Sequence, residues 1–188
     1  MSAAFPPAFD AAFFRTALGR FATPNDDRCY IAVDGESYSG VTVATTAGPD
    51  GQPVGLTVSS FNSVSLNPPL ILWSLARTSS SLAAFERCQR YVVNVLSASQ
   101  IALARRFATG KTPERFAGLT LAQAPAGTPM LGEGCAAWFE CRNRSRYEEG
   151  DHIIMVGQVE HCGHSGVPPL VFHAGGFDLT PPHGGASS

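Results

Sequence analysis

The stretch VTVATTAGPDGQPVGLTVSS, residues 41–60, decides how the chain begins its main sheet. Val41–Thr46 alternates apolar and polar residues and is rich in β-branched side chains, which is typical of a β-strand. Ala47–Pro53 contains glycines, prolines and an aspartate, residue types that favour turns. Because Val54–Ser60 resumes the strand pattern, the stretch predicts two strands joined by a turn.

Further strands are expected downstream. Leu70–Leu75 and Tyr91–Leu96 are apolar runs of strand length, which indicates burial on both faces. Ala136–Arg142 and His152–Glu160 are interpreted as two long strands, joined as a hairpin by the acidic, glycine-containing link Glu148–Asp151. The chain is therefore expected to be mainly β.

Three helices are predicted among these strands. Asp10 is a suitable N-cap for a helix over Ala11–Phe21, and two shorter helices are expected over Ser79–Cys88 and Ser97–Ala108. Many short strands with few helices favour a small β-barrel with helices at its rim over a doubly wound sheet. The glycine-rich fingerprint GxGxxG is absent, so a nucleotide must be held in another way.

Composition narrows the class of protein. The 188 residues are enough for one domain, expected over residues 10–179. Its flanks, 1–9 and 180–188, are expected to be flexible and disordered. Only 15% of the residues are charged, which favours coverage of some surface by a partner subunit. The net charge of −2 and the lack of a basic run argue against nucleic-acid binding.

The sequence also indicates a cytoplasmic protein that is not inserted in a membrane. The first residues lack the basic and apolar regions of a signal peptide, and no apolar run is long enough to span a bilayer. Five widely spaced cysteines without a CxxC pair argue against both a disulfide framework and a zinc site. We therefore expect no bound metal.

A polar segment, TVSSFNSVS at Thr57–Ser65, follows the second predicted strand. Its hydroxyl groups and backbone N–H groups can meet a planar heterocycle that needs several hydrogen-bond partners along one edge. The alternative is a polar turn whose hydroxyls bond their own backbone. Considered alone, the segment favours the turn slightly.

Two further clusters are suited to an anion. Three serines at 79–81 stand where a short helix is predicted to begin, and paired arginines at 105 and 106 stand near the end of the next one. Plain helix capping and a solvated helix end are the competing interpretations. His152, in the triplet GDH, either contacts a nicotinamide or is a turn histidine bonded to Asp151.

In order along the chain, GLTVSSFNSVSLNPPL, SSSLAAF, YVVNVLSASQIALARRFA, ERFAGL, PMLGEGCAAWFECR and GDHIIMVGQV resemble the flavin reductase family, the reductase components of two-component flavin monooxygenases. The resemblance extends from about Phe14 to Phe177. It implies a homodimeric, FMN-binding split β-barrel in which NADH or NADPH reduces the flavin for a partner monooxygenase. FAD is the alternative flavin.

The resemblance also assigns roles to residues. His152 is implied near the nicotinamide, and no side chain is needed as an acid or base for the hydride step. The implied flavin contacts comprise the polar segment, the serines before the short helix and the end of the next helix: Thr57, Val58, Ser59, Ser60, Ser63, Val64, Ser65, Ser80, Ser81, Arg106 and Phe107.

Two departures from the family pattern stand out. Residues 24–39 form an insertion whose Asp34-Gly35 pair predicts an added hairpin, which covers the flavin, reaches the other subunit of the dimer or is a harmless surface insertion. Ala174–Phe177 lacks the charged residue common in similar chains, which leaves the choice between NADH and NADPH open. A flavin-delivery protein without turnover and an oxidase with its own organic substrate remain the alternative functions.

Overall fold

The computed structural model describes residues 9–21, 39–173 and 176–178. The expected inserted hairpin at 24–39, apart from Ser39, lies outside the described residues. So do the expected flexible N-terminus and the expected disordered tail, apart from Phe9.

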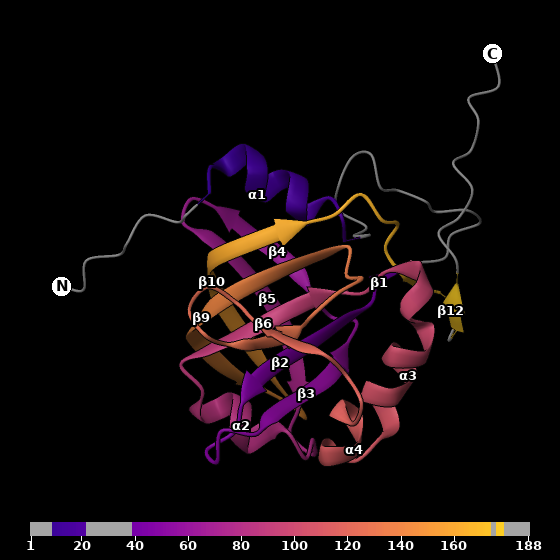
Figure 1. Cartoon of the computed structure of the whole chain (residues 1–188). Helices are drawn as coiled ribbons and strands as arrows, with labels where there is room; N and C mark the ends of the chain where they lie inside the picture. The colour runs from indigo at the N-terminus through magenta and orange to yellow at the C-terminus, as the bar shows by residue number, and fades with distance from the viewer. Residues whose placement is uncertain (1–8, 22–38, 174–175, 179–188) are drawn as a thin grey trace.

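A seven-stranded antiparallel sheet forms the centre of the molecule, in the order β3-β2-β6-β9-β10-β5-β4 (Figure 1). Its strands are β2 (Thr42–Ala47), β3 (Pro53–Val58), β4 (Asn62–Leu66), β5 (Pro69–Ala76), β6 (Arg90–Val95), β9 (Ala137–Glu149) and β10 (His152–His164). The mainly β architecture expected from the sequence is confirmed.

Smaller elements lie at the margins of this sheet. Two minor sheets are formed by β1 (Ser39–Gly40), β11 (Val171–His173) and β12 (Gly176–Asp178), and by β7 (Leu121–Gln123) with β8 (Pro129–Leu131). The helices are α1 (Ala11–Leu18), α2 (Leu82–Arg87), the 3₁₀ turn η1 (Ala98–Gln100), α3 (Ile101–Thr109) and α4 (Thr112–Phe116). Figure 1 shows α1 at one end of the sheet and α3 and α4 beside β3.

Two of the expected helix starts are confirmed, the helix expected from Ser79 begins at Leu82, and one helix was not expected. The Asp10 side chain accepts a hydrogen bond from the Phe13 N–H at 2.7 Å, and Ser97 forms a capping box with Gln100. Helix α4 was not predicted because five residues are too few to display a helical period. Its local signals are the proline and Glu114 in its first turn and Arg115 in its last turn.

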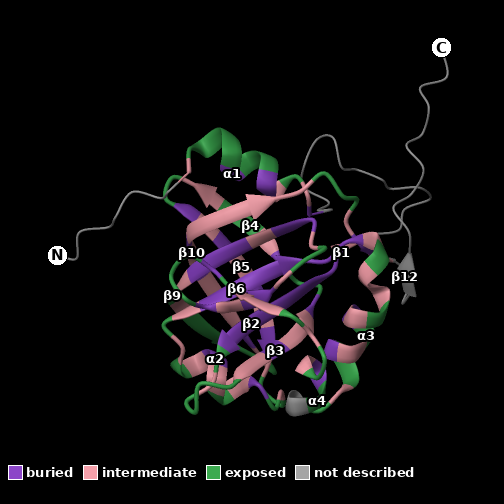
Figure 2. Cartoon of the chain, in the orientation of Figure 1, coloured by how far each residue is buried: buried purple, intermediate pink, exposed green. Residues whose placement is uncertain are grey.

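The expectation that β5 is buried on both faces is wrong. Ile71, Trp73 and Leu75 are fully buried, whereas Leu70 and Leu72 on the other face keep partial exposure. In contrast, Tyr91–Leu96 is buried throughout, as predicted. Figure 2 shows that burial is concentrated in the middle strands of the sheet. The apolar outer face of β5 is therefore a surface rather than a second core.

The β9–β10 hairpin is longer than predicted. Both strands have 13 residues, and their pairing continues to His152 opposite Glu149, beyond the end of β6 at Arg90. The charged sequence between Arg142 and Glu149 hides this extension from a hydrophobicity pattern. On its other side, β10 pairs with β5, which places His152 directly opposite Ala76.

Candidate functional site

The first part of the candidate site is the end of β3, where helix α3 is fastened to the strand. The Thr57 hydroxyl donates to the carbonyl of Ala104 in α3 at 2.7 Å. Val58 is 5% exposed, and its carbonyl accepts a hydrogen bond from the Thr42 hydroxyl at 2.9 Å. Both residues therefore position the loop that follows them. Neither of their side chains is exposed to solvent at the surface of this loop.

The polar loop after β3 is held against β5 by one serine. The Ser60 oxygen accepts a hydrogen bond from the Ser74 N–H at 2.9 Å and donates to the Ser74 carbonyl at 3.3 Å. The adjacent Ser59 is exposed and makes no hydrogen bond to the described residues. Ser60 thus fixes the loop, and Ser59 is available at the surface.

Strand β4 carries the other residues of the polar segment along the edge of the sheet. Ser63 and Val64 are exposed, Ser65 is half-buried, and the register with β5 shifts between Ser63 and Ser65. Val64 is 49% exposed, which is high for a large apolar side chain. An edge strand with free hydroxyl and apolar groups can form one wall of a ligand site.

The serines before α2 divide into different roles. The Ser79 hydroxyl accepts a hydrogen bond from the Ser81 N–H at 3.2 Å, so Ser79 stabilises the turn that precedes the helix. Ser80 is exposed. Ser81 is 1% exposed and makes no capping bond with its side chain, which instead meets a guanidinium group.

That guanidinium belongs to Arg115, which the site prediction from sequence missed. Arg115 donates from Nε to the Gly110 carbonyl at 2.6 Å, and from Nη1 to the Gly55 carbonyl at 2.7 Å and to the Ser81 hydroxyl at 3.3 Å. Removal from water lowers the pKa of Arg115 from its usual value. The sole pointer in the sequence was the motif ERFAGL, which contains this arginine.

The predicted pair Arg106 and Phe107 lies on the same side of the molecule. The Arg106 guanidinium donates to the Glu114 carbonyl from Nε at 3.1 Å and from Nη2 at 2.9 Å, and to the Ala117 carbonyl. Phe107 is fully buried and meets the ring of Phe116 edge-on at 4.9 Å. Both residues hold α4 onto α3, and their roles toward a phosphate stay predictions.

His152 lies on the other edge of β5 from the polar loop, near the same end of the strand. It lies opposite Ala76, two residues along β5 from Ser74, the residue that holds Ser60; this step is about 7 Å. Its Nδ1 lies 2.7 Å from an Asp151 oxygen, and this hydrogen bond lowers the pKa of Asp151. The imidazole is 45% exposed. The turn contact considered from the sequence is therefore present, and Nε2 makes no hydrogen bond to the described residues.

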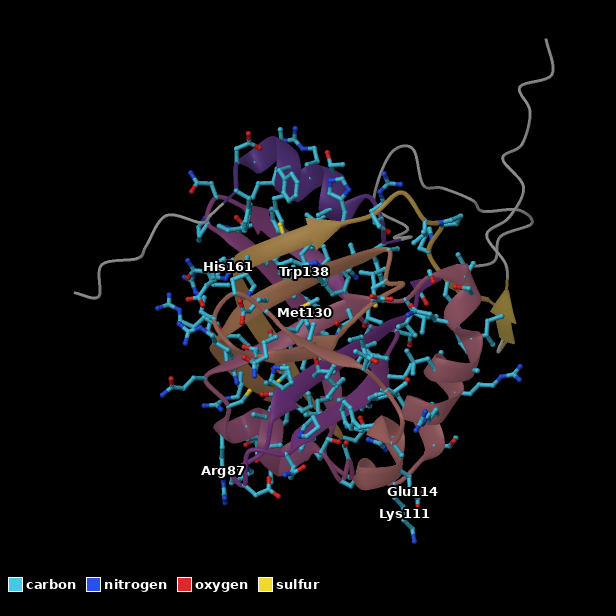
Figure 3. The ribbon with its side chains drawn as sticks, viewed as in Figure 1. Arg87, Lys111, Glu114, Met130, Trp138 and His161 are labelled. Atoms are coloured by element: carbon cyan, nitrogen blue, oxygen red, sulfur yellow. The ribbon has the colours of Figure 1, made fainter. Side chains whose placement is uncertain are left out.

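Other titratable groups fit structural roles. The fully buried Glu140 carboxylate accepts hydrogen bonds from the N–H groups of Ala126 and Thr128 and contacts His161 Nδ1 at 2.9 Å. Figure 3 shows His161 on the sheet beside Trp138, away from α4. Within residues 9–21, 39–173 and 176–178, no group of His, Cys, Asp and Glu is arranged to hold a metal ion.

The match to known families decides how this geometry is interpreted. Residues 35–180 match the family model described as the flavin reductase like domain, which is more than half of the chain. The chain belongs to the flavin reductase family. The matched segment contains the polar loop, the serines before α2, Arg115 and His152, so all parts of the candidate site lie inside it.

Individual relatives agree with this assignment. The chain is 40% identical over 164 residues to the FMN reductase (NADH) SmoA of Agrobacterium fabrum, covering 87% of this chain and 83% of that protein. It is 36% identical over 171 residues to HsaB, the reductase subunit of a flavin-dependent monooxygenase of Rhodococcus jostii, covering 90% and 78%. The NADH:FAD oxidoreductase SgcE6 of Streptomyces globisporus, solved with NAD and FAD fragments, matches with a TM-score of 0.73 and 31% identity, covering 87% and 98%.

The residues of this family member fit a flavin at the candidate site. A flavin with a phosphate presents a heterocycle edge, a hydroxylated chain and an anion. The exposed Ser59 and Ser63 suit the first two, and the buried Arg115 cation suits the third. In the part of the chain that the structure describes, no helix is long and apolar enough to cross a membrane.

Proposed function

We propose that this chain is an NAD(P)H-dependent flavin reductase that supplies reduced flavin to a partner monooxygenase. The observation that carries the proposal is that the polar loop and His152 flank the same end of β5, one on each edge of the strand, within the segment matched to the flavin reductase family. The reductase role named for SmoA and HsaB supports it.

In this proposal the chain binds and orients, and the flavin, when bound, supplies the hydride-accepting chemistry. The residues from Thr57 to Ser65 line the heterocycle and its hydroxylated chain. Ser80 and Ser81 lie toward the phosphate end, with Arg106 and Phe107 behind them. His152 contacts the nicotinamide through its exposed ring, whose orientation Asp151 fixes.

The cofactor is proposed to be FMN, with FAD as the alternative, and the reductant NADH or NADPH. SmoA is named for FMN and NADH, whereas SgcE6 is named for FAD and NADH. A cytoplasmic location is part of the same proposal.

The proposed split barrel acts as a homodimer, formed through the outer face of β5 and β10. Leu72 lies opposite Val156 on this face, beside Leu70 and Ile154, and all four apolar side chains are partly exposed. His152 shares the face, so a second copy seated there borders the site. Light scattering is expected to give twice the chain mass, and a charge introduced by Val156→Arg should give monomers that bind flavin more weakly.

The function is tested by mixing the protein with FMN and NADH or NADPH under air and following the loss of reduced nicotinamide. A reductase oxidises the nicotinamide at a rate that rises with added flavin. Tight flavin binding without nicotinamide consumption would instead identify a flavin-binding or flavin-delivery protein. Consumption that requires an added organic compound would identify an oxidase of that compound.

A further inference from the structure

The buried guanidinium group of Arg115 has an unusual set of partners. Arg115 is 8% exposed, and its hydrogen bonds go to two carbonyls and one hydroxyl, all of them neutral. These bonds use Nε and Nη1, which leaves the N–H groups of Nη2 without a bond to the described residues. The side chain is thus held firmly while part of its donor capacity stays free.

Arg115 also lacks a counter-charge among the described residues, since no carboxylate oxygen lies within 4.0 Å of it there. Other arginines of the chain do have such partners: Arg90 is 2.7 Å from Glu160, and Arg77 is 2.7 Å from Glu148. An arginine remains charged even when buried, and a buried charge without a counter-ion is costly. The lowered pKa of Arg115 reflects this cost.

The position of Arg115 indicates which anion would compensate this charge. Its guanidinium joins the backbone of β3 at Gly55 to the serine turn before α2 at Ser81. Ser80 in the same turn is exposed and adds a free hydroxyl. The free N–H groups of Nη2 on a buried cation, beside serine hydroxyls, are suited to the oxygens of a phosphate group.

We propose that Arg115 is the residue by which this chain selects a flavin with a 5′-phosphate over riboflavin. The proposal rests on the proposed flavin reductase function and adds the residue that determines this specificity. Arg106 also binds carbonyls through two of its nitrogens, but it is only half-buried, so water already compensates its charge and it makes a poorer candidate for this role. In this proposal Arg115 binds the 5′-phosphate of the flavin and does not take part in hydride transfer.

The test compares FMN and riboflavin in parallel fluorescence titrations. For Arg115→Gln we expect the Kd for FMN to rise about 10- to 100-fold, the loss expected when a charge-assisted contact is removed. The Kd for riboflavin should stay within about twofold, because the heterocycle contacts are intact. Lys111→Gln is the matched control: it removes a charge from an exposed side chain that projects away from the start of α4 (Figure 3), and should change neither Kd.

Two milder variants keep the test decisive if Arg115→Gln does not fold. Arg115→Lys retains the charge without the planar guanidinium group and its free Nη2, and Ser81→Ala removes one hydroxyl while leaving the Gly55 and Gly110 contacts. Each should weaken FMN binding and raise the KM for FMN, with kcat and riboflavin binding nearly unchanged.

Three results have distinct meanings. Equal weakening of FMN and riboflavin would overturn the proposal and make Arg115 a structural clamp. A wild-type protein that binds FMN and riboflavin with equal Kd and reduces both would also overturn the selectivity proposal, while leaving the reductase function intact. A wild-type protein that binds neither flavin would refute the proposed function itself, and the selectivity proposal with it.

Discussion

Replacing Gly157 with alanine should destabilise the core beneath the candidate site. Gly157 lies in β10, and a Cβ atom built there would stand 2.3 Å from the Tyr91 hydroxyl oxygen and 2.9 Å from the Cβ of Cys141. Neither neighbour can move freely, since Tyr91 and Cys141 are fully buried in strands. Overpacking of this kind costs about 1–3 kcal/mol.

The expected change is large enough to measure. For a chain of this size a loss of that order lowers Tm by roughly 2–12 °C. Gly166→Ala is the matched control, because nothing lies within 4 Å of the Cβ that it adds. Its Tm should stay within about 2 °C of wild type. Thermal unfolding followed by circular dichroism, at one protein concentration, measures both variants.

Combining Gly157→Ala with Tyr91→Phe tests the cause. The Tyr91 hydroxyl makes no hydrogen bond to the described residues, so Tyr91→Phe alone should change stability by less than about 1 kcal/mol. In the Tyr91→Phe background, Gly157→Ala should destabilise the protein by at least about 1 kcal/mol less than it does in the wild type. The added Cβ would still stand 2.9 Å from the Cβ of Cys141 and 3.0 Å from the ring carbon Cζ of residue 91. An equal cost in both backgrounds would refute the packing argument.

This core supports the site through α2. Phe85 of α2 packs edge-on against Trp73 at 5.1 Å and lies 6.3 Å from Tyr91. A shift of these rings would be transmitted to the serine turn that precedes α2. Gly157→Ala is therefore expected to weaken flavin binding as well as lower Tm.

Three other predictions concern the serines of the polar loop, His152 and two partly buried thiols. Ser59→Ala combined with Ser60→Ala should weaken FMN binding several-fold with the fold intact, and unchanged affinity in a fluorescence titration would remove both side chains from the site. His152→Ala should raise the KM for the nicotinamide with little change in FMN affinity. Unaltered steady-state kinetics would show that His152 is only a turn residue bonded to Asp151. Burial raises the pKa of Cys135 to about 11 and of Cys162 to about 12, against 9.0 for a free thiol, so the free energy of unfolding should fall as pH rises above about 9. Denaturant titrations from pH 8 to 10 measure this, and Cys162→Ala should flatten the slope.

Patterns that repeat along a strand were predictable from the sequence. The alternation in Val41–Thr46 and the turn residues that follow it predict the β2–β3 pair, and the structure has this pair. The apolar run Leu70–Leu75 predicted a strand correctly but its burial wrongly. A run of apolar residues does not reveal whether an outer face meets a second layer of the same chain or remains partly exposed.

Contacts between distant segments were not predictable in this way. The Ser60 hydroxyl bonds the backbone of Ser74, and Arg115 joins Gly55 and Ser81, which precede it by 60 and 34 residues. The local sequence around Ser60 or Arg115 is compatible with several hydrogen-bond partners. The partner is fixed only when the strands of the sheet have paired. The location of the polar loop was therefore predictable, whereas the residues that hold it and the buried cation were not.

The most direct test of the central claim is anaerobic reduction of the flavin by the nicotinamide. With oxygen excluded, the protein is mixed with FMN and NADH, and in parallel with NADPH, while the absorbance of the oxidised flavin is followed. A flavin reductase bleaches the flavin at a rate proportional to protein concentration, consumes nicotinamide and flavin in equal amounts, and releases reduced flavin that passes an ultrafiltration membrane. Flavin that binds but stays oxidised with both nicotinamides would contradict the account.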